Sequence, residues 1–245
     1  MTEIYRFEGK MTSNNLKIIY EDNHILSLVK PSGLLSQGDI SGDADLLNMI
    51  KEDLKIRYNK PGEAFVGLIH RLDRNTGGTM VYAKTSKGAS RLSKQLRDKD
   101  FKKGYFAVVK GIVKQDGVLK HKLKKDNRQN KVYEAEDGKL SILEYKVVES
   151  CNDSTLLFVI PITGRTHQIR VQMALFGHPL LGDVKYGYDE NKGNLLALWS
   201  SCIKVKHVTM DKYLLLQSIP EGSGFWSQFK EETYIKTLDE LGDVL

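Results

Sequence analysis

The chain has 245 residues, of which 40% are hydrophobic and 28% charged, a mixture that indicates a folded globular protein and argues against disorder. Cys151 and Cys202 are the two cysteines, and no Cys-x-x-Cys pattern surrounds either, which argues against a disulfide scaffold or a zinc site. Because the amino terminus has no signal core and no apolar run is long enough to cross a bilayer, we expect a cytoplasmic protein without membrane contact.

The formal net charge is +6, which favours a polyanionic partner. The excess is concentrated between residues 101 and 131, where only Asp116 and Asp126 oppose ten basic residues. These are Lys102, Lys103, Lys110, Lys114, Lys120, Lys122, Lys124, Lys125, Arg128 and Lys131. Such a local positive field is suited to phosphates, although a solvated, highly charged loop would look the same.

The first half of the chain predicts a hairpin, two helices and a strand. Apolar runs at residues 16–20 and 25–29 flank a short polar turn, which is typical of a hairpin. Apolar residues recur at helical spacing in 45–58, with Asp43 or Asp45 as the cap, and again in 86–99. Residues 79–84 predict a strand between these helices.

The second half adds strands, a hairpin and two helices. Residues 105–113 alternate as a strand, and 133–149 predict a hairpin that turns at Asp137 and Gly138. Residues 156–162 form a continuous apolar run that suits a buried central strand. We expect a helix over 166–176, a late strand over 197–208 and a final helix over 226–241. Since strands and helices do not alternate regularly, the pattern predicts an α+β fold with a largely antiparallel sheet.

The densest polar cluster is the segment HRLDRNTGG at residues 70–78. It follows an apolar stretch and runs into two glycines, and functional side chains are commonly presented at such turns. A carboxylate beside Arg71, Arg74 and His70 should stay ionised, so Asp73 suits a nucleophile better than a general acid. The alternative is that Asp73 and Thr76 only hydrogen-bond the turn.

A second polar cluster, GRTHQIR at residues 164–170, follows the apolar run 156–162 and opens the predicted helix. Arg165 would lie at the junction between strand and helix, where its rigid fork suits a carboxylate or a phosphate. The alternative is an arginine that packs over surface loops. Thr166 and Arg170 would share one helix face.

Two other motifs are set aside. The first cluster is similar to the catalytic loop of protein kinases, but a leucine precedes the aspartate and no glycine-rich phosphate loop accompanies it. It also lacks the spaced histidines of a zinc protease.

Four segments, in order, resemble the RluA-type RNA pseudouridine synthases. They are IYED with KPSG (19–22 and 30–33), HRLDRNTGG (70–78), KGYFAVVKG (103–111), and GRTHQIRV with GHPLLGD and YG (164–171, 177–183 and 186–187). The resemblance covers about residues 16–208, and two departures are visible. Gly77 stands where the family usually has serine, and Trp199 lies where it commonly has histidine.

The resemblance implies the pseudouridine synthase fold, a mixed sheet split into two halves and flanked by helices, with the active site in the central cleft. It implies that a uridine in structured RNA, ribosomal or transfer, is isomerised without a cofactor or metal. Asp73 matches the family's catalytic aspartate, which attacks C1′ or removes a sugar proton. Tyr105 matches the active-site tyrosine and Arg165 the arginine that pairs with the aspartate.

Arg71 matches the family's arginine that fills the gap left by the flipped-out base. The basic stretch adjoins the tyrosine segment, so we expect it to hold RNA phosphates. The expected RNA contacts are Arg71, Lys103, Lys122, Lys124, Lys125 and Arg128. His70 and Arg74 have no assigned role.

Since the resemblance begins near residue 16, we expect residues 1–245 to form one catalytic domain without a separate RNA-binding domain. A monomer is the default expectation, because no motif reports the oligomeric state. Two other functions stay open. One is an RNA-binding or ribosome-assembly protein without turnover, and the other is a metal-dependent nuclease, which would need clustered acidic or histidine ligands.

Overall fold

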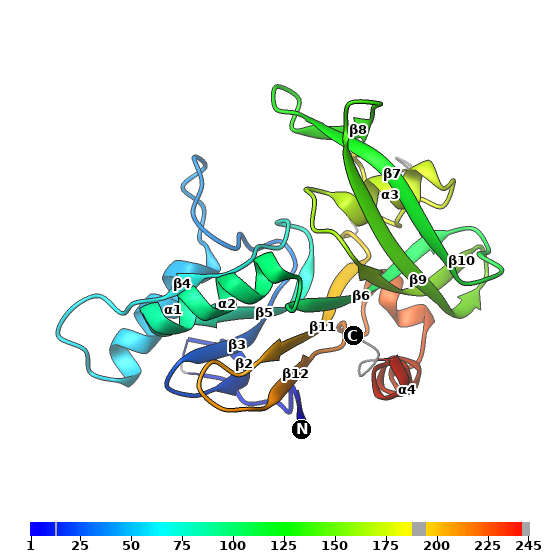
Figure 1. Cartoon of the computed structure of the whole chain (residues 1–245). Coiled ribbons are helices and arrows are strands. Elements are labelled where there is room, and N and C mark those ends of the chain that lie inside the picture. Colours follow the sequence, from blue (N-terminus) through cyan, green and yellow to red (C-terminus); the bar gives the residue numbers. More distant parts are fainter. Residues whose placement is uncertain (13, 188–194, 242–245) are drawn as a thin grey trace. The chain divides into compact units, whose positions relative to one another are not determined.

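The structure is a computed structural model that describes residues 1–12, 14–187 and 195–241. These residues form two compact units, whose elements are labelled in Figure 1. Unit 1 comprises Met1–Lys103 and Ser200–Pro220, and unit 2 comprises Gly104–Trp199 and Glu221–Leu241. Strands β6 (Lys102–Lys110) and β11 (Leu198–Lys206) carry the chain between them. One catalytic domain over residues 1–245 stays a prediction.

Unit 1 is built on antiparallel strands whose middle members are completely buried. In it β3 (Ile25–Lys30) pairs with β2 (Lys17–Glu21) on one side and with β5 (Gly77–Ala83) on the other, and β4 (Gly67–Leu68) pairs with β5. The predicted hairpin over residues 16–29 is confirmed. The Asp22 carboxylate closes its turn by accepting the N–H groups of His24 and Ile25, each at 2.7 Å.

Two strands of unit 1 were not predicted. Strand β1 (Thr2–Arg6) runs parallel to β12 (Tyr213–Gln217), and β12 is antiparallel to β11. Their pairing joins the amino-terminal segment to residues more than two hundred positions later, so no local pattern reports it. Because β1 and β12 are parallel while most of the other strand pairs are antiparallel, the sheet is mixed but largely antiparallel, and the α+β prediction is confirmed.

The two predicted helices of unit 1 are confirmed. Helix α1 (Leu46–Arg57) begins after Asp45, whose carboxylate accepts the Asn48 N–H at 3.0 Å and caps it. Helix α2 (Ser86–Asp98) is capped by Thr85 and ends at Lys99, which adopts the left-handed conformation. Helix α2 contacts β4 and β5, which lead to and from the segment 70–78.

Unit 2 contains an antiparallel sheet with the strand order β6–β10–β9–β7–β8. Its other strands are β7 (Gly117–Asp126), β8 (Lys131–Glu134), β9 (Lys139–Cys151) and β10 (Ser154–Pro161). Strand β10 corresponds to the apolar run at 156–162 and, as predicted, is central and mostly buried. The rings of Phe106 and Tyr234, 5.1 Å apart between centroids, pack α4 (Glu231–Leu241) against β6.

The predicted hairpin over residues 133–149 is wrong. Strands β8 and β9 lie on opposite edges of β7, and each pairs with β7 rather than with the other. Most of the lysine-rich stretch at residues 101–131 lies in the two strands β6 and β7, not in a loop. The alternation of β7 was hidden because its buried positions, Leu119 and Leu123, are separated by two lysines and a histidine.

The remaining helices begin and end differently from the prediction. Helix α3 (Gln168–Leu175) begins two residues later than expected, because His167 adopts a left-handed conformation with φ of 52°. Thr166 therefore lies before the helix, not on the same face as Arg170. The final predicted helix is divided into a 3₁₀ turn, η1 (Gly224–Gln228), and α4, with extended Phe229 between them.

Candidate functional site

The segment that carries Asp73 is a turn between β4 and β5. The Thr76 N–H donates to the Asp73 carbonyl oxygen at 3.0 Å, and strand β5 starts at the next residue. Leu72, the residue before Asp73, is held by Ser36. The Ser36 hydroxyl donates to the Leu72 carbonyl at 2.8 Å and accepts the Leu72 N–H at 3.1 Å. The backbone is thus fixed on both sides of a half-buried aspartate.

Lys30 ties the KPSG turn to the Asp73 turn. Its side chain is buried, and its ammonium group donates to the carbonyl oxygens of Pro31, Leu34 and Arg74 at 2.9, 2.7 and 3.0 Å. The Gly33 N–H also donates to the Arg74 carbonyl, at 2.9 Å. Burial lowers the pKa of Lys30 to about 7, and the charge of Asp73 opposes that shift. Lys30 therefore interacts electrostatically with Asp73, and near neutral pH it carries its positive charge only part of the time.

Arg74 and His70, two basic neighbours of Asp73 in the sequence, have partners other than Asp73. The Arg74 guanidinium donates to the Gly33 carbonyl at 3.0 Å and pairs with Asp43 at 2.7 Å. The His70 ring is buried, and its Nε2 accepts the Val81 N–H at 3.1 Å. Burial, with a smaller contribution from Lys103, lowers the pKa of His70 well below its ordinary value, so this ring is neutral. Both side chains have structural roles.

Arg71 and Lys103 complete the predicted set in unit 1. Arg71 is exposed and directly precedes Leu72. Lys103 lies in β6 with its ammonium group 5.6 Å from the Phe101 ring centroid, and burial lowers its pKa to about 8. A lysine with this pKa is partly neutral near pH 8, so its charge depends on pH more than that of an exposed lysine.

Unit 2 carries Tyr105 and Arg165. Tyr105 lies in β6 opposite Val159 of β10, and its side chain is 8% exposed. Arg165 is exposed and lies between the end of β10 and the start of α3, at the strand–helix junction that its position in the sequence indicated.

Gln168 holds the loop in front of α3. Its buried amide oxygen accepts the Arg165 N–H at 3.0 Å and the Thr163 hydroxyl at 2.9 Å. Its amide nitrogen donates to the Ile142 carbonyl of β9 at 3.0 Å. Gln168 thereby fixes the backbone of Arg165 against the sheet and leaves the guanidinium exposed. The sequence contained this residue within GRTHQIR but offered no reason to select it.

Arg170 also has a structural partner. Its guanidinium makes a two-point ion pair with the buried Asp183, with N–O distances of 2.8 and 2.7 Å. Next to this pair, the Tyr186 hydroxyl contacts His167 Nδ1 at 2.7 Å and accepts the Val132 N–H at 2.8 Å. The family-like segments 164–171, 177–183 and 186–187 are therefore joined by hydrogen bonds around the start of α3.

These motifs match a known family over most of the chain. The sequence model of the RNA pseudouridylate synthase family matches residues 24–175. The chain belongs to the RNA pseudouridylate synthase family. The RluA-type resemblance of the sequence is thereby confirmed.

Curated relatives within this family carry ribosomal names. The chain is 37% identical over 205 residues to the ribosomal large subunit pseudouridine synthase C of Vibrio parahaemolyticus, covering 80% of this chain and 63% of that protein. It is 40% identical over 176 residues to the synthase C of Escherichia coli, covering 69% of this chain and 53% of that protein. The chain therefore spans less than two thirds of the length of these relatives.

Solved structures of two human family members share the fold. The human RNA pseudouridylate synthase domain containing 4 aligns with a TM-score of 0.70 and 21% identity, covering 91% of this chain and 92% of that one. The human domain containing 1 aligns with a TM-score of 0.68 and 21% identity, covering 87% and 86%. At this identity the likeness supports the fold and nothing finer.

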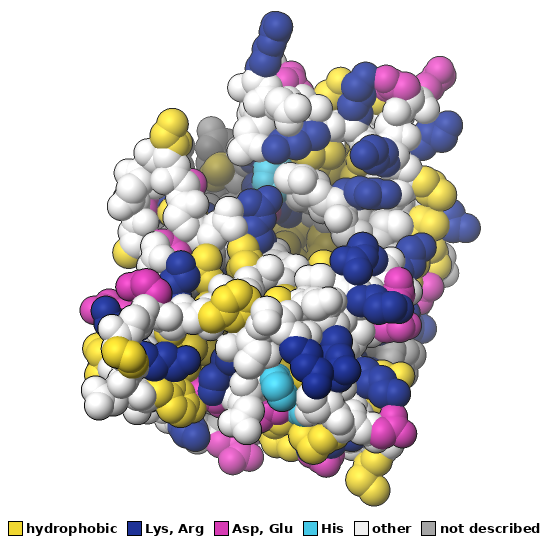
Figure 2. All heavy atoms as spheres, turned by 60° about the vertical axis from the view of Figure 1, so that its left-hand side comes forward, with side chains coloured by type: hydrophobic (Ala, Val, Ile, Leu, Met, Phe, Trp, Pro, Cys, Tyr) yellow, Lys and Arg dark blue, Asp and Glu magenta, His cyan; other side chains and the backbone are white. Residues whose placement is uncertain are grey.

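The exposed surface of this family member is rich in basic side chains. Lys122, Lys124, Lys125 and Arg128 are all exposed. Lys and Arg side chains are spread over much of the face drawn in Figure 2, whereas Asp and Glu lie mostly toward its edges. Within the described ranges, no helix has the length and apolar character needed to cross a membrane, and no group of three or more His, Cys, Asp or Glu could hold a metal ion.

Proposed function

We propose that the protein is an RNA pseudouridine synthase that isomerises a uridine in ribosomal RNA. In this reaction the bond from C1′ to uracil N1 breaks and a bond from C1′ to C5 forms, so atoms balance without a co-reactant. Membership of the RNA pseudouridylate synthase family is the observation that carries the proposal. The ribosomal names of the relatives favour ribosomal RNA over transfer RNA as the substrate class.

Within this proposal Asp73 is the catalytic carboxylate, acting at C1′ or on a sugar proton. The fixed backbone on both sides of Asp73 supports this assignment, because a catalytic group has to be held in place. Tyr105 packs against the flipped-out uracil, and Arg165 keeps the carboxylate ionised. Aromatic faces commonly stack on unpaired bases.

The basic side chains bind the RNA backbone in this proposal. Arg71 fills the gap left by the target base, and the exposed or partly buried Lys103, Lys122, Lys124, Lys125 and Arg128 contact phosphates. Such contacts give affinity that falls with salt and carries little sequence choice. We also propose that the protein is a cytoplasmic monomer, which light scattering of the purified chain would test.

The decisive experiment measures tritium release from ribosomal RNA labelled at uracil C5. Asp73→Asn should lower the rate by about a thousandfold or more while leaving RNA affinity within about threefold, because an amide keeps the shape but not the charge. Asp211→Asn is the matched control, since Asp211 is exposed and pairs only with Lys206 among the described residues. Full activity of Asp73→Asn would contradict the proposal.

The same assay separates the open alternatives. A binding protein without turnover would release no tritium. In that case, a gene carrying Asp73→Asn would rescue every phenotype of a deletion of the gene. A metal-dependent nuclease would cut the RNA and lose activity with chelator. Mapping pseudouridines with and without the gene would identify the RNA, and new sites in transfer RNA alone would contradict the ribosomal assignment.

A further inference from the structure

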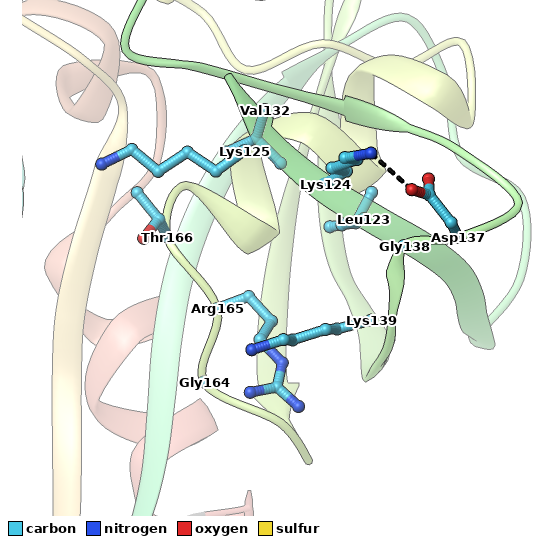
Figure 3. Close-up of a pocket in the computed structure, with 10 residues that line it drawn as sticks. All are labelled: Leu123, Lys124, Lys125, Val132, Asp137, Gly138, Lys139, Gly164, Arg165 and Thr166. Atoms are coloured by element: carbon cyan, nitrogen blue, oxygen red, sulfur yellow. Dashed lines mark hydrogen bonds and ion pairs between the residues drawn. The ribbon is translucent and has the colours of Figure 1, made fainter. Parts of the chain in front are cut away.

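Unit 2 contains a pocket of about 460 Å³ beside Arg165 (Figure 3). One wall is the sheet face that carries Leu123 of β7 and Val132 of β8, and the other is the loop of residues 164–166. Leu123 and Val132 belong to a buried apolar cluster, so the pocket has a firm apolar floor. Its volume lies within the range of sites that hold small organic or nucleotide groups.

The strand register puts two of the three lysines that line the pocket on the side of its apolar floor. Lys139 is the cross-strand partner of Leu123, and Lys125 is the partner of Val132. Because cross-strand partners lie on the same face of a sheet, both lysines are on the side of the apolar floor. Lys120 and Lys122 alternate with Leu123 along β7 and therefore lie on the opposite face.

The pocket has an excess of positive charge. Its basic residues are Lys124, Lys125, Lys139 and Arg165, and its one acidic residue, Asp137, forms an ion pair with Lys124 (Figure 3). In the described part of the chain, neither Lys125, Lys139 nor Arg165 forms an ion pair with a carboxylate. Three cations near one small cavity repel one another, and an anion bound there would relieve that repulsion.

The arrangement of hydrogen-bond donors in the pocket also suits a phosphate. The Arg165 and Lys139 side chains approach each other in Figure 3, so a fork-shaped donor and an ammonium group lie together. Thr166 adds an exposed hydroxyl, and the space around the Cα of Gly164 is open within 4 Å, which lets a ligand approach the backbone. Arginine forks and lysine ammonium groups are the usual partners of phosphate oxygens.

We propose that this pocket binds a backbone phosphate of the RNA substrate, through Lys125, Lys139 and Arg165. The inference rests on the proposed function and adds to it, because it separates the lysines that line a built site from those that only contribute to a field. It adds Lys139, which lies outside the basic stretch of the sequence, to the expected RNA contacts. It gives Lys124 no part in binding this phosphate, because Lys124 forms an ion pair with Asp137.

The test compares Lys125→Gln, Lys139→Gln and the double variant with Lys120→Gln, a control on the other face of the same strand. RNA affinity is measured with fluorescently labelled ribosomal RNA over a range of salt concentrations. Each phosphate contact with a single strand contributes about 0.7 to the slope of log affinity against log salt, so the double variant should lower the slope by about 1.4. Its Kd for the RNA should rise about tenfold or more at fixed salt.

A second arm replaces chloride by inorganic phosphate at equal ionic strength. Phosphate should weaken RNA binding by the wild type more than by the double variant, because only the wild type keeps the pocket. An equal loss of slope in Lys120→Gln would show a diffuse field and overturn the inference, as would equal phosphate sensitivity of the two proteins. RNA binding is measured without turnover, so the two proposals fail separately. A wild type that releases no tritium would contradict the proposed function, whereas the phosphate pocket is decided by the salt and phosphate dependence of RNA affinity.

Discussion

The substitution Gly78→Ala tests how the Asp73 turn is held against the sheet. Gly78 lies at the start of β5 with φ of +117°, a conformation that side chains rarely adopt. A Cβ at this position would lie 2.5 Å from the Ser200 nitrogen, 2.8 Å from the Ser200 carbonyl carbon and closer still to the carbonyl oxygen. These are backbone atoms of β11, so no side-chain rotation can relieve the overlap.

The expected loss of stability has two parts. Backbone strain at a residue with this φ costs about 1–3 kcal/mol, and overpacking against a buried backbone costs about 1–3 kcal/mol more. We therefore expect the free energy of unfolding to fall by about 4 kcal/mol, a large share of the roughly 5–15 kcal/mol that stabilises a folded domain. For a chain of this size, the melting temperature should fall by about 8–16 °C.

Thermal and urea unfolding, followed by circular dichroism, measure this loss. Gly62→Ala is the control, because the space around Gly62 is open within 4 Å and its φ is not in the left-handed region. The control should change the free energy by no more than about 1 kcal/mol, and in the stabilising direction. A Gly78→Ala protein that melts within about 2 °C of wild type would refute the reasoning.

Two further substitutions test unit 1. Lys30→Met leaves the Pro31 and Leu34 carbonyls without this donor, at about 1–3 kcal/mol each, whereas the Arg74 carbonyl keeps the Gly33 N–H. Urea unfolding should therefore show a loss of about 2 kcal/mol or more, and exposed Lys60→Met should show none. The Glu21 pKa is lowered because hydrogen bonds from Lys84 and Arg57 outweigh the opposing effect of burial. The stabilisation from Glu21 is fully present above its ordinary pKa of 4.5 and is lost as the pH falls through its lowered pKa. Glu21→Gln should therefore lose less stability in acid than wild type when melting temperature is measured against pH. Parallel curves of melting temperature against pH for the two proteins would contradict this.

Local patterns in the sequence determined several elements and the family. The hairpin over residues 16–29 follows from two apolar runs around a polar turn, and α1 follows from helical spacing after Asp45. These features depend on neighbours within a few residues, which is why they can be predicted from the chain alone. The segments at 70–78 and 164–170 indicated the family for the same reason, since each is a short, continuous motif.

The tertiary structure decided what lies beside these motifs. Only the folded chain places Lys30 on the Arg74 carbonyl, buries His70 as a neutral ring, and puts β7 between β8 and β9. It also separates Lys125, in the pocket with Lys139, from Lys120 on the other face. Charge state and the direction of a side chain depend on burial and strand register, and these arise from segments that are distant in sequence. The sequence by itself therefore determined the family and its motif residues, because these are local, and the fold decided which side chains act together.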